Sequence, residues 1–300
     1  MTPAVAVCDP TAPRPRLADL VELTKPRVNV LVLVTTGVGY YLGSAGRPLL
    51  LPLVWTLAGT GLAAAGTLAL NQYMERDVDA RMERTRHRPL PEGRLGVGEA
   101  LAFGLALLGT GLAWELGFVN ALAALVTTTI AVAYLFLYTP LKRVTPLCSI
   151  VGAVPGALPP VAGWVAARGA LGFEPCVLFA IMFLWQIPHS LAIARLYRDD
   201  YARAGIRLLP VVDPGGASTG THVVTNCLAL LPVALLPTLI GLTGPIYFAV
   251  ALTLGLVFLW SAIGLARTGT AAGARRLLFA SLIYLPVLLA VMALDKLGSA

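Results

Sequence analysis

The sequence predicts an all-α membrane protein, a bundle of about nine transmembrane helices around a central cavity. Of its 300 residues, 57% are hydrophobic and only 12% are charged, whereas a soluble domain carries about 25% charged residues. The apolar segments recur at the length of roughly 20 residues that a helix needs to cross a bilayer. The ionisable residues between these segments gather in alternate loops. Together these observations exclude a water-soluble fold.

Hydropathy divides the chain into a tail and one membrane domain. Residues 1–27 contain several prolines and no apolar run long enough for a signal peptide, so we expect a cytosolic N-terminal tail. Residues 28–295 form a single transmembrane domain. The spans are expected near residues 28–46, 50–74, 98–116, 119–138, 147–167, 173–195, 222–242, 245–265 and 277–294.

The basic residues indicate the orientation of these spans. With a cytosolic N-terminus, 19 Lys and Arg residues lie in the tail and the cytosolic loops, and 3 lie on the other side. Such a bias over short loops is typical of cytosolic segments. It also accounts for the net charge of +7 without nucleic-acid binding. We expect a multi-pass protein of a bacterial plasma membrane.

The acidic residues suggest an internal repeat. Acidic clusters follow the second and sixth spans, whereas the basic pairs Lys142-Arg143 and Arg275-Arg276 follow the fourth and eighth. Equivalent loops thus lie four spans apart. This spacing favours a four-helix pseudo-repeat.

The acidic cluster after the second span has the spacing of a metal site. Asn71, Glu75 and Asp79 share one face if the helix continues past the membrane boundary. Mg²⁺ prefers such oxygen ligands and is often bound through carboxylates and substrate phosphates. Asp199 and Asp200, after the sixth span, are candidates for a second ion. The alternative is that these acids are solvated loop charges paired with nearby arginines.

Basic residues beside the acids are candidates for binding a diphosphate. Arg86, Arg88, Lys142 and Arg143 lie in the same set of loops, and both Arg and Lys bind phosphate oxygens. For each of them, ordinary membrane topology is the alternative explanation.

Two features of the spans favour a polar or open interior. His189 follows Pro188 near the cytosolic end of the sixth span, where an ionisable residue is a functional candidate. Its imidazole could bind a haem iron or a substrate, or bond to a backbone carbonyl. Residues 152–164 are rich in Gly and Pro, which predicts a broken helix lining a cavity.

Several motifs resemble the UbiA-type intramembrane prenyltransferases, and within them the branch whose acceptor is haem b. The resemblance covers nearly the whole chain, from Leu23 to Leu285. The segments that carry it are 23–27 (LTKPR), 71–79 (NQYMERDVD), 84–90 (RTRHRPL), 138–143 (YTPLKR), the Pro-rich segment ending at Trp164, Pro188-His189 and 199–205 (DDYARAG).

The resemblance implies a Mg²⁺-dependent transfer of farnesyl from farnesyl diphosphate to a vinyl group of haem b, giving haem O. It implies catalytic or metal-binding roles for Asn71, Glu75, Asp79, Asp199, Asp200 and Lys142, and acceptor-binding roles for His189 and Tyr138. Many relatives carry a DxxxD motif in the second acidic loop. Here only the Asp199-Asp200 pair and His189 are present, which favours haem over a small phenol but puts a second metal in doubt.

Three other functions fit parts of the pattern. The first is the same transferase class with a quinone precursor or a chlorin as acceptor. The second is a secondary transporter, although transporters place charges near the bilayer midplane. The third is an assembly factor for a respiratory oxidase, which does not require paired acidic clusters. For the transferase we expect the bilayer, both substrates and a downstream haem A-forming enzyme as partners.

Overall fold

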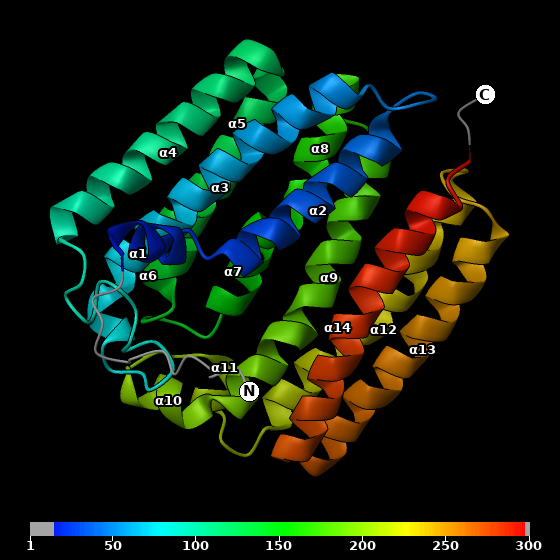
Figure 1. Ribbon diagram of the computed structural model, residues 1–300. Helices are drawn as coiled ribbons and strands as arrows, with labels where there is room; N and C mark the ends of the chain where they lie inside the picture. The colour runs from blue at the N-terminus through cyan, green and yellow to red at the C-terminus, as the bar shows by residue number, and fades with distance from the viewer. Residues whose placement is uncertain (1–14, 298–300) are drawn as a thin grey trace, which may run out of the picture.

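The computed structural model describes residues 15–297, and nearly all of this range is helical. The long helices run side by side in one bundle (Figure 1). Within residues 15–297 the extended pairing is limited to an isolated bridge between Thr243 and Lys296. The predicted all-α class is confirmed.

The helices follow one another with short connections. In chain order they are α1 Arg16–Leu23, α2 Pro26–Gly43, α3 Leu50–Asp79, α4 Val97–Phe118, α5 Ala121–Val132, the π-helix η1 Ala133–Tyr138, α6 Thr139–Leu141, α7 Cys148–Ala157, α8 Pro159–Arg168, α9 Phe173–Leu196, α10 Arg198–Arg203, α11 Leu209–Val212, α12 Ala217–Leu239, α13 Pro245–Thr268 and α14 Ala271–Leu294.

In the described part of the chain, eight helical segments are long and apolar enough to cross a membrane. They are α3, α4, the continuous stretch Ala121–Leu141, the stretch Cys148–Arg168, α9, α12, α13 and α14. The first predicted span corresponds to α2, which has 18 residues and carries the polar Arg27 and Asn29 in its first turn. Because α2 is less apolar than the others, the predicted number of nine spans is approximate.

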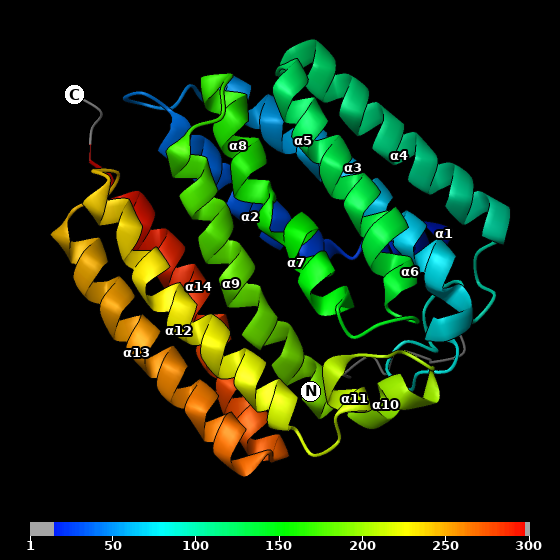
Figure 2. The same cartoon turned by 180° about the vertical axis from the view of Figure 1, so that it is seen from behind.

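The bundle consists of two groups of helices that meet at α9. In the first group α3 packs against α4, and α2 packs against α8; in the second, α12 packs against α13 and α9. Helix α9 also contacts α7 and α14, so it joins the two groups (Figure 2). The short helices α1, α10 and α11 lie at one end of the bundle (Figure 1).

The Gly- and Pro-rich segment forms a broken helix, as predicted. Helix α7 ends at Ala157 and α8 begins at Pro159, so the helix is interrupted at Leu158. Proline cannot donate a backbone hydrogen bond, and this loosens the helical ladder at such a position. Gln186 of α9 donates to the carbonyl of Gly152 at 3.2 Å, which ties α7 to α9.

The described part of the predicted N-terminal tail contains a docked helix. Helix α1 packs through Leu23, which is fully buried, against Ala69 of α3 and against Leu90, Leu95 and Ala100. Residues 1–14 of the predicted tail lie outside the described residues. The segment 15–27 is therefore part of the folded domain, because its apolar face is covered by α3 and the loop that follows it.

Candidate active site

Helix α3 continues through Asp79 and carries three polar side chains on one face. Asn71, Glu75 and Asp79 are spaced by four residues, and we call this set the acidic ladder. Asn71 is fully buried and Asp79 is only 2% exposed. The Asn71 Nδ2 donates to Glu75 Oε2 at 3.0 Å. The expectation that the helix extends beyond the apolar segment is met, and the ladder is buried at one end of the bundle.

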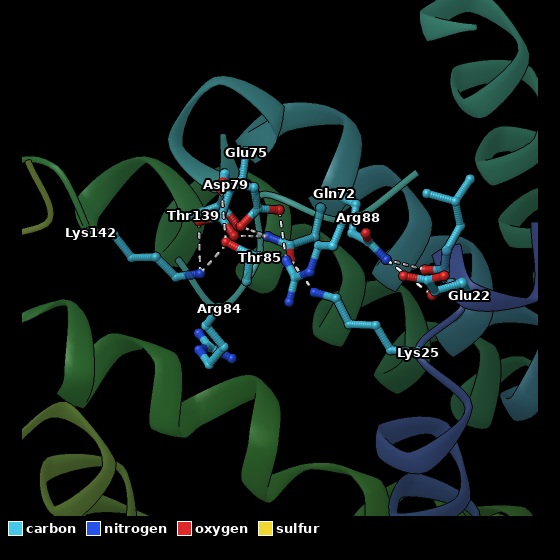
Figure 3. A network of polar contacts seen from close by, with 12 residues as sticks. Glu22, Lys25, Gln72, Glu75, Asp79, Arg84, Thr85, Arg88, Thr139 and Lys142 are labelled. Carbon is cyan, nitrogen blue, oxygen red and sulfur yellow. Dashed lines mark hydrogen bonds and ion pairs between the residues drawn. The ribbon is translucent and has the colours of Figure 1, made fainter. Parts of the chain in front are cut away.

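Three cationic side chains from separate segments approach the ladder (Figure 3). Lys142 Nζ lies 2.8 Å from Glu75 Oε1, and Arg88 Nη1 lies 2.6 Å from Asp79 Oδ2. The third cation, Lys25, donates to Asn71 Oδ1 at 2.8 Å. The ladder is thus surrounded by groups that bind anionic oxygen atoms.

The junction between α1 and α2 places the side chain of Lys25 beside the ladder. Lys25 has a φ of 47°, a left-handed conformation that lets the chain turn sharply before Pro26 starts α2. On the other side of the turn, Gln72 donates to the carbonyl of Leu23 at 2.8 Å and fixes the end of α1. Desolvation, reinforced by the charge of Arg88, lowers the pKa of Lys25 to about 7.

Lys142 follows an irregular stretch of helix. The π-helical turn η1 ends at Tyr138, and the ammonium of Lys142 lies 4.3 Å from the centre of the Tyr138 ring, a distance typical of a cation–π contact. Although burial disfavours the charged form, Tyr138 and the Glu75 carboxylate raise the pKa of Lys142 above its usual value. Thr139 accepts from Asn71 Nδ2 at 3.1 Å and so connects this turn to the ladder.

The other two predicted diphosphate ligands do not contact the ladder in residues 15–297. Arg86 pairs with Glu83 at 2.5 Å, and both side chains are at least half exposed. Arg143 makes no hydrogen bond or ion pair through its side chain within the described residues. Of the four basic residues predicted from the sequence, the structure brings Arg88 and Lys142 to the ladder.

The second acidic pair has a different setting. Asp200 Oδ1 accepts from the backbone N–H of Glu83 at 2.8 Å and from Arg203 at 2.6 Å. Although burial disfavours ionisation, these donors hold the pKa of Asp200 below its usual value. Asp199 has an 80% exposed side chain and pairs with Arg198. Asp200 therefore ties α10 to the loop after α3, and its predicted role at a second metal ion stays a prediction.

The residues predicted to bind the acceptor lie on different helices. Tyr138 packs directly against Gly152 of α7, where a Cβ would overlap its ring. His189 lies on α9, where its Nδ1 is 2.7 Å from Ser281 Oγ of α14. From the sequence, a backbone carbonyl was one possible partner of His189. In the structure its partner is the side-chain hydroxyl of Ser281.

Arg94 connects α1 to the loop after α3. It forms an ion pair with the buried Asp19 of α1, and its Nη2 lies 3.6 Å from Glu22 of the same helix. On the loop side, Arg94 donates to the carbonyl of His87 at 2.8 Å and to Glu92 at 2.8 Å. One guanidinium thus joins the segment that ends in Lys25 to the segment that carries Arg88.

Sequence reasoning missed several residues of this site. Lys25, Gln72 and Thr139 contact the ladder or its supports, and Asp19 and Arg94 hold the segments around it. Lys25 lies in the segment 23–27 (LTKPR) that carries the resemblance and precedes a proline at the start of a span, but neither signal gave it a role. A buried aspartate in a predicted tail gives no signal, because its partner Arg94 lies far along the chain.

Comparison with known proteins identifies the family. The model of the UbiA prenyltransferase family matches residues 32–283. A protoheme IX farnesyltransferase of Solibacter usitatus is 49% identical over 291 residues, covering 94% of this chain and all of the relative. One of Koribacter versatilis is 45% identical over 97% of this chain and 99% of the relative.

Solved structures agree with the fold at lower identity. A digeranylgeranylglyceryl phosphate synthase superposes with a TM-score of 0.79 at 18% identity, covering 93% of this chain and 98% of that one. A UbiA homologue from Archaeoglobus fulgidus bound to GPP and Mg²⁺ superposes with a TM-score of 0.69 at 18% identity, covering 92% of this chain and 99% of that one. This multi-pass membrane protein belongs to the UbiA prenyltransferase family.

Proposed function

We propose that this chain transfers the farnesyl group of farnesyl diphosphate to a vinyl group of haem b, giving haem O. The observation that carries the proposal is the buried acidic ladder with three cationic side chains around it. The names of relatives that are 49% and 45% identical to this chain support haem b as the acceptor. In the proposed reaction the bond to the diphosphate breaks and the diphosphate leaves with its electron pair. The allylic carbon joins the vinyl carbon, water adds to the resulting cation as the hydroxyl, and the remaining proton of the water is released with the diphosphate.

The donor set of the ladder suits Mg²⁺. Asn71, Glu75 and Asp79 offer oxygen atoms on one helix face. In residues 15–297 no group of three His, Cys, Asp or Glu side chains could hold a metal by itself. Mg²⁺ commonly takes one or two carboxylates and completes its coordination with substrate phosphates and water. The ladder fits that mode of binding. The bound ion would neutralise charge on the diphosphate oxygens.

The residues of the chain supply the rest of the charge compensation. Lys142 and Arg88 already contact the ladder carboxylates at 2.8 Å and 2.6 Å, so their cationic groups lie where diphosphate oxygens would meet the ladder. We assign diphosphate binding to these two residues and to Lys25. Preorganised cations stabilise the charge that develops on a leaving group better than water does. Asp199, Arg86 and Arg143 would have roles only if substrate draws them in.

The proposed orientation places this site at the cytosolic face. Lys and Arg are divided 19 to 3 between the two sets of loops, and the ladder, α1 and α10 belong to the side with 19. We propose a bacterial plasma membrane as the location. The product would pass to a downstream haem A-forming enzyme.

The test is the mass of haem extracted after purified protein is incubated in detergent with haem b, farnesyl diphosphate and Mg²⁺. Haem O should form, and EDTA should prevent it. Asp79→Asn should lower turnover by at least about 10²-fold, whereas Asp77→Asn, the matched control on an exposed position of the same helix, should retain it. Consumption of farnesyl diphosphate with unchanged haem b would assign another acceptor, and no consumption would reject the transferase function.

A further inference from the structure

A cluster of three side chains joins α9 to α14 away from the acidic ladder. His189 Nδ1 lies 2.7 Å from Ser281 Oγ, and its ring stacks on Trp185 with centroids 4.8 Å apart. Trp185 Nε1 in turn donates to the backbone carbonyl of Ser281 at 3.0 Å. Ser281 is fully buried. The His189 ring is therefore held in one orientation by its own contact to Ser281 and by stacking on Trp185, which also bonds to Ser281.

The hydrogen bonds of Ser281 determine which nitrogen of His189 carries the hydrogen. Ser281 Oγ donates to the carbonyl of Leu278 at 2.6 Å. A hydroxyl has a single hydrogen, and a carbonyl can only accept, so that hydrogen is committed to Leu278. The contact between Ser281 Oγ and His189 Nδ1 then requires that Nδ1 donates. His189 Nδ1 is protonated.

The second nitrogen, Nε2, is left with a free lone pair. No carboxylate contacts His189 within residues 15–297, so a charged imidazolium would lack a counter-ion in the interior, which is costly. The ring is therefore neutral, with its hydrogen on Nδ1. Nε2 makes no hydrogen bond within the described residues, and the side chain is only partly buried. A neutral imidazole with an accessible Nε2 and a bonded Nδ1–H is the form that binds metals.

We propose that Nε2 of His189 binds the iron of the haem b acceptor, and that Ser281 is the positioning residue that fixes the ring and its tautomer. This inference rests on the proposed function, because it takes haem b as the substrate. An iron ligand on α9 gives the porphyrin a fixed orientation in the bundle. Removal of the hydrogen-bond partner of a metal-binding histidine typically changes metal affinity by about 10- to 100-fold.

The test uses the full-length protein with haem b and no farnesyl diphosphate. Resonance Raman spectra of the reduced complex should show an iron–histidine stretching band. His189→Gly should lose the band, and added imidazole should restore it. His222, a partly buried histidine in the first two turns of α12, provides the matched control: His222→Ala should leave the band unchanged.

Variants of Ser281 test its positioning role separately. Ser281→Ala should keep the band but shift its frequency, because the Nδ1–H loses its acceptor, and should weaken haem binding by about tenfold. Ser281→Thr, which keeps the hydroxyl, should return the frequency to that of the unmodified protein. An unchanged frequency in Ser281→Ala would overturn the positioning role.

Two outcomes separate this inference from the proposed function. A band that persists in His189→Gly, while haem O is still formed by the unmodified protein, would reject His189 as the ligand and leave the transferase function intact. Absence of both haem binding and haem O formation in the unmodified protein would reject the two together.

Discussion

Removal of Arg94 should release α1 and with it Lys25. In Arg94→Ala the Asp19 carboxylate, 3% exposed, is left with no other cationic partner in the described residues. Breaking a buried pair from one side costs about 3 to 5 kcal/mol. We take about 3 kcal/mol, since α1 can open without unfolding the bundle. Amide hydrogen exchange of residues 16–25 should then accelerate by roughly 10²-fold.

Removal of the partner residue, Asp19, should destabilise the docked α1 less. In Asp19→Ala, Arg94 keeps Glu92 at 2.8 Å and Glu22 at 3.6 Å, so its charge remains paired. We expect the free energy of opening α1 to fall by about 1 kcal/mol, which makes amide exchange of residues 16–25 roughly fivefold faster. Arg86→Ala is the matched control, because its ion pair is exposed and contributes little.

Hydrogen–deuterium exchange with mass analysis measures the opening, and the Michaelis constant for farnesyl diphosphate measures its effect on the site. The exchange rate and the Michaelis constant should both rise in Arg94→Ala, since Lys25 reaches the ladder only when α1 is docked. Unchanged exchange in residues 16–25 would refute the reasoning about Arg94. Faster exchange with an unchanged Michaelis constant would remove Lys25 from the diphosphate site.

Three further substitutions test the site and the packing. Lys142→Gln removes a charge-assisted contact and should raise the Michaelis constant for farnesyl diphosphate by about 10- to 100-fold in steady-state assays. Gly163→Ala places a Cβ against the backbone of α2 and should lower the melting temperature in detergent, whereas Gly109→Ala, which meets no atom within 4 Å, should not. Glu115→Gln keeps an acceptor for two threonine hydroxyls and should melt at the temperature of the unmodified protein. Glu115→Leu removes that acceptor and should lower the free energy of unfolding by about 1 kcal/mol, seen as a lower melting temperature.

The parts of the molecule that sequence could predict depend on local regularity. The apolar segments give the spans, because a helix in lipid must satisfy its own backbone. The ladder follows from a spacing of four residues along one helix, which needs no knowledge of tertiary structure. The break between α7 and α8 follows from Pro159 and Pro160. Each of these features is determined within a few turns of chain.

The missed features depend on contacts between distant segments. Lys25 and Asn71 are 46 positions apart, and Asp200 and Glu83 are 117 apart. A pair of aspartates after a span looks the same whether metal ions or backbone N–H groups satisfy it. For this reason the sequence could not show the hydrogen bonds from Glu83 and Arg203 to Asp200, and the second metal site stays a prediction. The docking of α1 could not be predicted for the same reason, since Arg94, the partner of Asp19, lies on another segment.

The charge balance of the ladder connects its structure to diphosphate chemistry. Glu75 and Asp79 provide two negative charges, and the cationic side chains that contact the ladder are Lys25, Arg88 and Lys142. The site thus has at most one excess positive charge, which is less than the charge of a diphosphate. A diphosphate that entered alone would leave uncompensated negative charge beside buried carboxylates, which is costly. A divalent cation bound together with the diphosphate removes that imbalance, and the ladder offers the oxygen ligands it prefers. The carboxylates and the basic residues therefore act as one unit, and neither set alone suffices for binding the substrate.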